Sequence, residues 1–248
     1  MCLLAAALVT PHSQTNEMTE MIRIEQVSKT YSVGGNEVHA LRNTTLNVDA
    51  GEFVAVVGPS GSGKSTLLSI LGGMLSPSHG TVKLEGESLY DVGVEERAEI
   101  RNRRIGFVFQ SFNLIQWLNA LENVELPLRL YGSDRNWRRN TAAQMLERFG
   151  LADRMNHRPS ELSSGQQQRV ALARTLATSP RLILADEPTG NLDTETRDLV
   201  IETLSDLCNE GRSVILVTHD QSISAKASRV LHIADGLVTE QRRQIAVA

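Results

Sequence analysis

The stretch of sequence that decides the fold is Gly58-Pro59-Ser60-Gly61-Ser62-Gly63-Lys64-Ser65. It joins a continuous apolar run, Glu52–Val57, to Lys64–Leu71, whose apolar residues recur at helical spacing. This order predicts a buried strand, a glycine-rich turn and a helix. Because glycine has no Cβ atom, the backbone N–H groups of such a turn can point toward a phosphate, and the helix N-terminus adds a favourable dipole. The sequence therefore predicts a phosphate-binding loop.

The spacing of this loop matches the P-loop pattern, which assigns roles to its last residues. We expect Lys64 to reach the β- and γ-phosphates of a nucleotide and Ser65 to bind Mg²⁺ through its hydroxyl group. A chance glycine turn is the alternative, and the strand before the loop and the helix after it argue against that alternative. The nucleotide-binding residues predicted here are Gly58, Ser60, Gly61, Ser62, Gly63, Lys64, Ser65 and Thr66.

An acidic pair, Asp186-Glu187, follows a second apolar strand, Arg181–Ala185. Such a pair alone would usually be a helix cap or a solvated turn. In a chain with a P-loop, we expect Asp186 to hold the Mg²⁺ shell at the end of its strand. Glu187 would then orient or deprotonate an attacking water, which makes it a candidate catalytic residue.

Strands and helices alternate over most of the chain, which predicts an α/β fold with a largely parallel sheet. We expect Asp235-Gly236 to form a hairpin turn, and Ser163 and Gln166 to form a capping box at a helix start. The helices expected in the second half are about Gly165–Ser179 and Thr194–Gly211. The other expected strands are Arg23–Val27, Thr45–Asp49, Thr81–Glu85, Ile105–Phe109, Ser213–Thr218, Val230–Ala234 and Leu237–Glu240.

The organisation predicted is a P-loop NTPase (RecA-like) core, an antiparallel β subdomain and an inserted helical subdomain. The core is assigned to residues 21–88 and 161–240. The helical subdomain is assigned to about 89–160, where charged residues are dense and helical stretches dominate. Residues 1–20 are expected to be a disordered tail, because their apolar run, Met1–Val9, is short and lacks the basic lead-in of a signal peptide.

Composition narrows the function classes. The net charge of −4 gives no basic surface of the kind that nucleic-acid binders carry, so we expect no nucleic-acid partner. Two distant cysteines, Cys2 and Cys208, cannot form a disulfide framework and indicate a reducing compartment. No run reaches the roughly 18–20 apolar residues that a membrane helix needs, so a membrane span would have to come from another polypeptide.

The segment Leu162-Ser163-Ser164-Gly165-Gln166 resembles the signature of the ABC (ATP-binding cassette) ATPases, Leu-Ser-Gly-Gly-Gln. Further motifs resemble that family: Gln110 its Q-loop, Asn191-Leu192-Asp193 its D-loop, and His219 its switch histidine. Tyr31 stands at the position of the aromatic residue that stacks on adenine. These motifs extend from about Ile22 to Glu240, nearly the whole chain outside the tail.

The resemblance implies ATP as the nucleotide, Mg²⁺ as the metal and hydrolysis as the reaction. By this resemblance Glu187, His219, Gln110 and Lys64 are the catalytic residues, and Ser65, Gln110 and Asp186 hold the metal. It also makes Tyr31, Ser163, Gly165, Gln166 and Asp193 nucleotide contacts. Asp193 can also be interpreted as a helix N-cap, and a histidine that ends a buried strand is more often structural.

The signature segment implies a homodimer, because in the family it meets the γ-phosphate bound by the opposite subunit. Closure of the dimer on ATP and its opening after hydrolysis would do the mechanical work. Ser164 stands where glycine is usual, and serine would be strained there if the position required a positive φ.

The resemblance further implies permease partners in the membrane and a place on the cytoplasmic face of the inner (plasma) membrane. The segments 106–114 and 120–124 resemble the group that serves lipoprotein release and macrolide or peptide export. A periplasmic or membrane-fusion partner is compatible with that group. Three alternatives stay open: an amino-acid importer ATPase, a cell-division type regulatory module with little turnover, and a nucleic-acid-handling ABC ATPase.

Overall fold

The central sheet has the strand order β10-β9-β3-β8-β7-β6 in the computed structural model, which describes residues 20–131, 134–190 and 192–242. Its strands are β3 (Phe53–Val57), β6 (Ile105–Phe109), β7 (Leu182–Asp186), β8 (Ser213–Val217), β9 (Arg229–Ala234) and β10 (Leu237–Arg242). Neighbouring strands from β6 to β9 are parallel, and the final pair, β9 and β10, is the antiparallel hairpin expected at Asp235-Gly236. The predicted α/β class with a largely parallel sheet is confirmed.

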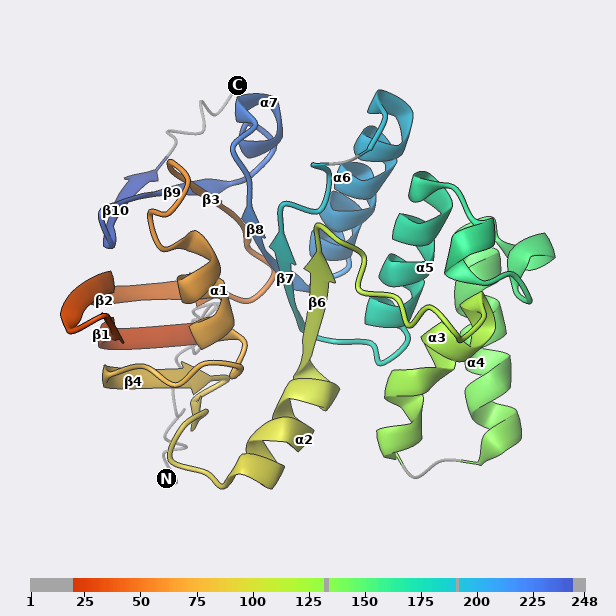
Figure 1. The fold of residues 1–248 in the computed structure, drawn as a ribbon, viewed down its shortest axis with the longest axis horizontal. Coiled ribbons are helices and arrows are strands. Elements are labelled where there is room, and N and C mark those ends of the chain that lie inside the picture. Colours follow the sequence, from red (N-terminus) through yellow and green to blue (C-terminus); the bar gives the residue numbers. More distant parts are fainter. Residues whose placement is uncertain (1–19, 132–133, 191, 243–248) are drawn as a thin grey trace, which may run out of the picture.

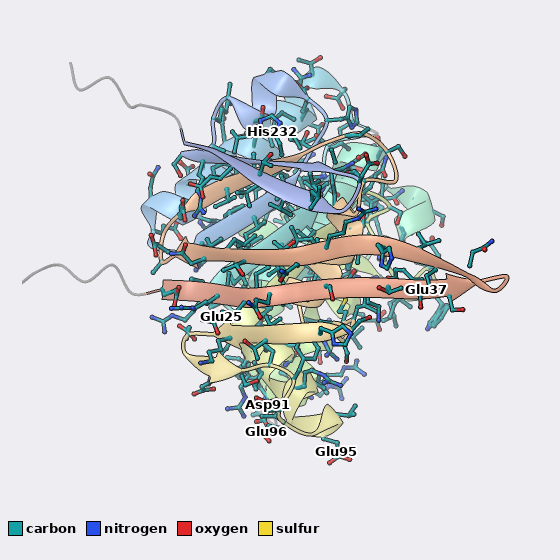
Figure 2. All side chains as sticks on the ribbon, turned by 90° about the vertical axis from the view of Figure 1, so that its left-hand side faces the viewer. Glu25, Glu37, Asp91, Glu95, Glu96 and His232 are labelled. Atoms are coloured by element: carbon teal, nitrogen blue, oxygen red, sulfur yellow. The ribbon has the colours of Figure 1, made fainter. Side chains whose placement is uncertain are left out.

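A second sheet is antiparallel and packs beside the first (Figure 1). Its strands are β1 (Glu20–Val33), β2 (Asn36–Asp49), β4 (His79–Leu84) and β5 (Glu87–Ser88). Figure 2 views the outer face of this sheet, with Glu25 and Glu37 on its two longest strands.

The predicted strands Arg23–Val27 and Thr45–Asp49 were too short, because β1 and β2 have 14 residues each and pair to the end, Val33 opposite Asn36. Gly34 and Gly35 both have positive φ, 58° and 84°, as a tight hairpin turn requires. The outer part of β2 is mostly exposed, so no run of buried apolar residues identifies it as a strand in the sequence.

Two hydrophobic cores lie on opposite faces of the central sheet. Val54 and Val56 of β3 pack in the core with helix α1 (Lys64–Leu71) and the antiparallel sheet. Phe53 and Ala55, which alternate with them, pack with helices α5 (Ser164–Leu176) and α6 (Thr194–Asn209). Helix α1 is therefore enclosed between the two sheets, as Figure 1 shows. Burial on both faces explains the continuous apolar runs of these strands.

The remaining helices are α2 (Val94–Arg104), α3 (Ala120–Glu125), α4 (Arg135–Arg148) and α7 (Gln221–Ser224). Short 3-10 helices span Leu126–Tyr131, Ala152–Arg154 and Pro159–Glu161. The division into core and helical subdomain remains a prediction, but β6, within the range 89–160, pairs with β7 in the central sheet. Of the predicted tail, residues 1–19 lie outside the described residues and Glu20 begins β1.

Helix α5 ends three residues earlier than the sequence predicted. The prediction extended it to Ser179, whereas the helix stops at Leu176 with Ala177 as its C-cap. Ser179 has a φ of 51°, which no helix accommodates, and Pro180 follows it.

Among the described residues, no helix is both long enough and apolar enough to cross a lipid bilayer.

A buried arginine joins the two sheets. Arg229 on β9 is 5% exposed and donates to the Asn47 backbone oxygen on β2 at 2.7 Å. Its other terminal nitrogen pairs with Glu240 on β10 at 2.7 Å, and Glu52 lies 3.5 Å away. One guanidinium group therefore links the C-terminal hairpin to the antiparallel sheet.

We predict that Arg229→Met lowers the free energy of unfolding by about 3 kcal/mol, because two partly buried carboxylates lose their counter-charge. The control is Arg148→Met. Arg148 pairs with Glu210 at 3.0 Å, but both side chains are more than 40% exposed. The control should cost about 0–1 kcal/mol. Urea denaturation followed by circular dichroism measures both, and equal losses would contradict a special role for Arg229.

Candidate nucleotide site

The carboxyl ends of four parallel strands meet at one edge of the central sheet. Phe109, the last residue of β6, lies opposite Asp186 of β7, and Asp186 lies opposite Val217 of β8. Val56 of β3 is aligned with Val217 in turn. The residues that follow these strands therefore leave the sheet side by side. They are the predicted site residues Gly58, Gln110, Glu187 and His219.

A pocket of about 390 Å³ opens at this edge. The glycine-rich loop lines it together with Glu187 and His219. The lining residues are Ala40, Gly58, Pro59, Ser60, Gly61, Gly63, Lys64, Ser65, Thr66, Glu187 and His219. The structure thus brings together most of the predicted loop residues, Lys64 among them, with the predicted catalytic residues Glu187 and His219. Ala40, on β2, is a lining residue that the sequence analysis did not assign.

Two glycines of the loop are required by close packing. A Cβ atom on Gly58 would lie 2.1 Å from the backbone oxygen of Ile233 on β9. A Cβ atom on Gly63 would lie 2.1 Å from the backbone oxygen of Ala40, and Gly63 has a φ of 108°. The loop is therefore held against both sheets, and only glycine fits at these two positions.

Lys64 begins α1 and is 8% exposed. Its ammonium group donates hydrogen bonds to the backbone oxygens of Gly58, at 2.9 Å, and Pro59, at 2.8 Å. An ammonium group has three donors, so a phosphate oxygen can be bound while one or both of these bonds remain. The loop carbonyls hold the charge of Lys64 at the floor of the pocket.

Glu187 occupies an unusual backbone conformation. Its φ is 46°, in the left-handed region, and its N–H donates to the backbone oxygen of Val217 at 3.0 Å. Such strain persists only where neighbouring structure enforces it, and it is frequent at functional sites. The imidazole Nδ1 of His219 lies 3.4 Å from the Glu187 carboxylate, and the His219 side chain is 70% exposed. Two of the four predicted catalytic residues, Glu187 and His219, therefore lie next to each other.

The residues expected to hold Mg²⁺ fit that ion chemically. Burial raises the pKa of Asp186, while a hydrogen bond from Ser65 lowers it and the neighbouring Glu187 raises it further. A magnesium ion at this carboxylate would offset the cost of burying its charge. Ser65 and Gln110 contribute hydroxyl and amide oxygens, which are hard ligands of the kind Mg²⁺ prefers. The Gln110 side chain packs closely over Gly190, just beyond Glu187.

The signature-like segment lies away from this pocket. Ser163 is the N-cap of α5, and its reciprocal hydrogen bonds with Gln166 confirm the predicted capping box. Ser164 is the first helical residue and is absent from the residues with positive φ, so serine is not strained there. Ser163 and Ser164 are exposed, while Gly165 packs against Thr196, 2.7 Å from where its Cβ would lie.

Two other predicted nucleotide contacts also lie outside the pocket lining. Asp193 caps α6, accepting from the Thr196 N–H and hydroxyl at 2.9 Å each, and these bonds lower the pKa of Asp193. The N-cap interpretation of Asp193 is thereby confirmed. Tyr31 lies near the tip of the β1–β2 hairpin, 36% exposed, with Lys29 over its ring at 5.3 Å. Asn191, the first residue of the predicted D-loop, lies outside the described residues.

Helix α5 supplies contacts that the sequence analysis missed. Arg174 donates to the backbone oxygens of Phe112, at 2.8 Å, and Asn113, at 2.6 Å. Both residues follow Gln110 and have positive φ, 58° and 49°. Burial lowers the pKa of Arg174. No sequence signal could have identified this contact, because its acceptors are main-chain oxygens that any residue provides.

The chain is similar to a known protein family and to several of its members. The family model described as "ABC transporter" matches residues 41–190. An ABC transporter ATP-binding protein of Thermotoga maritima is 47% identical over 221 residues, covering 89% of this chain and 94% of the relative. The macrolide export ATP-binding/permease protein MacB of Bdellovibrio bacteriovorus is 44% identical over 90% of this chain, which spans 34% of that longer protein.

Solved structures agree in fold. The dimeric ATP-binding cassette MJ0796, in a post-hydrolysis state bound to ADP and Pi, superposes with a TM-score of 0.85. It is 43% identical in sequence, and the match covers 91% of this chain and 100% of that cassette. A second dimeric structure of the same cassette gives the same TM-score at 44% identity.

We predict that Gly63→Ala weakens MgADP binding by about 30-fold or more, through about 2 kcal/mol of backbone strain and displacement of Ala40. The control is Gly61→Ala, because Gly61 also has a positive φ, 76°, but no atom lies within 4 Å of its Cβ position. Its loss should be about tenfold or less. Calorimetric titration measures both, and equal affinities would contradict the packing argument.

A second prediction concerns the buried charge of Asp186. Because the pKa of Asp186 is raised in the folded state, its stabilising contribution is present at low pH and is lost as pH rises through the folded-state pKa. Asp186→Asn should therefore stabilise the nucleotide-free protein at pH 7, and this gain should shrink toward pH 4. Urea denaturation across this pH range tests the sign. A gain that grew as pH fell would contradict it.

Proposed function

Because the chain belongs to the ABC transporter family, we propose that it is the ATP-hydrolysing subunit of a transporter whose membrane permease is a separate polypeptide. The observation that carries this proposal is the pocket that is lined by both the glycine-rich loop and the Glu187–His219 pair. A phosphate chain on the loop would present its last phosphate to that pair.

In this proposal the loop residues bind the phosphates. The backbone N–H groups of the α1 N-terminus and the Lys64 ammonium group neutralise the negative charge that grows on the transferred phosphate. Thr66 and Ser65 start the helix beside them, and Tyr31 stacks on the adenine ring. Stacking is compatible with the position of Tyr31 on β1, because Ala40 on the paired strand β2 lines the pocket.

Glu187 takes the role of general base toward the attacking water. Its strained backbone fixes the position of its Cα atom at the pocket, and His219 Nδ1 at 3.4 Å restrains the carboxylate. His219 is exposed and lines the pocket, where it can also donate to the γ-phosphate. Gln110, which directly follows β6, positions the same water.

Magnesium fits the oxygen donors of Ser65, Asp186 and Gln110, and when bound it would neutralise charge on the phosphates. Asp186 then serves as a carboxylate ligand, while Ser65 remains at the first turn of α1. These assignments follow from the donor types and from the hydrogen bond between Ser65 and Asp186.

The proposal includes a homodimer with two shared sites. Ser163, Gly165 and Gln166 lie outside their own chain's pocket, on the N-terminus of α5, which is an anion-binding element. In a twofold dimer the same segment of the second chain can complete the pocket. The dimeric form of the similar cassette, with ADP and Pi bound, supports this arrangement.

The permease class is proposed from similarity. Relatives named as macrolide export ATP-binding/permease proteins carry a cassette 44–46% identical to this chain within one longer polypeptide. We infer that this chain serves a permease of that export or extraction type, for a drug, peptide or lipoprotein, from the cytoplasmic face of the membrane. A membrane-fusion or periplasmic partner belongs to the same proposal.

We predict that Glu187→Gln lowers the turnover number at least 100-fold, the usual contribution of a general base, while retaining ATP. The variant should accumulate as an ATP-bound dimer, because the substrate that joins the two chains is no longer cleaved. Phosphate release and size-exclusion chromatography with ATP measure the two effects.

The matched control is Glu202→Gln, the same substitution at an exposed position of α6. It should behave as the wild type. Undiminished turnover in Glu187→Gln would remove Glu187 as the base. A wild-type chain that binds ATP but releases no phosphate, with or without its permease, would instead support the regulatory alternative.

A further inference from the structure

Gln168 is a fully buried polar residue on the signature helix α5, at 0% exposure. Its side-chain nitrogen Nε2 donates a hydrogen bond to the backbone oxygen of Pro188 at 2.8 Å. Pro188 directly follows Glu187, and as a proline it has no N–H, so this oxygen is its only backbone hydrogen-bonding group. The signature helix is therefore bonded to the residue beside the predicted catalytic base of its own chain.

The N-terminal end of α5 makes a second contact, with the start of helix α6. Gly165 lies one turn before Gln168, on the same side of α5. Gly165 packs against Thr196, whose N–H and hydroxyl are held by Asp193 at the start of α6. Helix α5 thus contacts Pro188, directly after Glu187, and also Thr196, in the first turn of α6.

The bonding of Gln168 is incomplete. Among the described residues, its side-chain oxygen Oε1 is buried without a hydrogen-bond partner. An unpaired buried acceptor is costly and uncommon, and it marks a place where the hydrogen bonding of one state is not the best possible. A small movement of α5 against Pro188 changes the surroundings of both ends of this amide.

We propose that Gln168 is a positioning residue that transmits a movement of the signature helix to Glu187 of the same chain. This inference rests on the proposed function, in which Ser163 and Gly165 meet the nucleotide bound by the partner chain. Nucleotide bound in the partner's site attracts the N-terminus of α5 and displaces the helix. The amide of Gln168 passes that displacement to Pro188. The position of Glu187 in each chain then depends on whether nucleotide occupies the other site.

The test compares Gln168→Met with Gln167→Met in the full-length chain. Gln167 is the adjacent residue of the same helix, and its Nε2 also donates to a backbone oxygen, that of Leu162, at 3.0 Å. Leu162 precedes the helix and is remote from Glu187 in sequence. Methionine keeps the length of the side chain. At Gln168 it removes the unpaired oxygen, which offsets part of the cost of leaving the buried Pro188 oxygen without its donor.

The expected result is a separation of nucleotide binding from turnover. Gln168→Met should bind MgADP within twofold of the wild type, lose at least tenfold in kcat, and show a Hill coefficient for ATP hydrolysis that falls to 1. Gln167→Met should keep the wild-type kcat and Hill coefficient. Wild-type kcat in Gln168→Met, or an equal loss in both variants, would overturn the inference, as would a loss of MgADP affinity that matches the loss of kcat.

A second measurement uses the native residue, in case Gln168→Met does not fold. In chain labelled with nitrogen-15 glutamine, the side-chain amide signal of Gln168 should shift between the MgADP-bound wild type and the ATP-bound dimer of Glu187→Gln. An unchanged signal would overturn the inference. A wild-type chain that neither hydrolyses ATP nor dimerises would overturn the proposed function instead, which keeps the two failures distinct.

Discussion

The parallel register of β3, β6, β7 and β8 is the constraint on which the site depends. Because Val56, Val217, Asp186 and Phe109 are aligned across the sheet, the glycine-rich loop, Glu187 and Gln110 leave it at one level. A shift of one residue in any pair would turn every following side chain to the other face. The apolar residues on both faces of these strands prevent such a shift, since two separate cores specify the register together.

The enclosure of α1 between two sheets has a direct chemical consequence. The helix begins at Lys64, so its N-terminus and the lysine charge are fixed at the floor of the pocket. The loop before it touches Ile233 of β9 and Ala40 of β2 through Gly58 and Gly63. A loop that must bind phosphates through its backbone is thereby held rigid by main-chain oxygens from both sheets, which supports preorganised binding.

Helix α5 connects the parts of the protein that the site requires. Its N-terminus carries the signature-like residues, Gln168 bonds to Pro188, and Arg174 holds the backbone after Gln110. These are contacts of one rigid element with the segments after two neighbouring strands. A displacement of the helix as a body therefore affects the surroundings of both Glu187 and Gln110, which is how a packed interior transmits movement.

The sequence by itself determined the α/β class, the loop at Gly58–Ser65, the acidic pair and the capping box of Ser163 and Gln166. These features depend on local spacing and on the apolar pattern, which neighbouring residues specify. Only the tertiary structure decided the full length of β1 and β2, the place of β6 in the central sheet and the end of α5. It alone also decided the contacts of Ala40, Gln168 and Arg174. Their partners are main-chain atoms or residues distant in sequence, and main-chain acceptors leave no mark in the order of side chains.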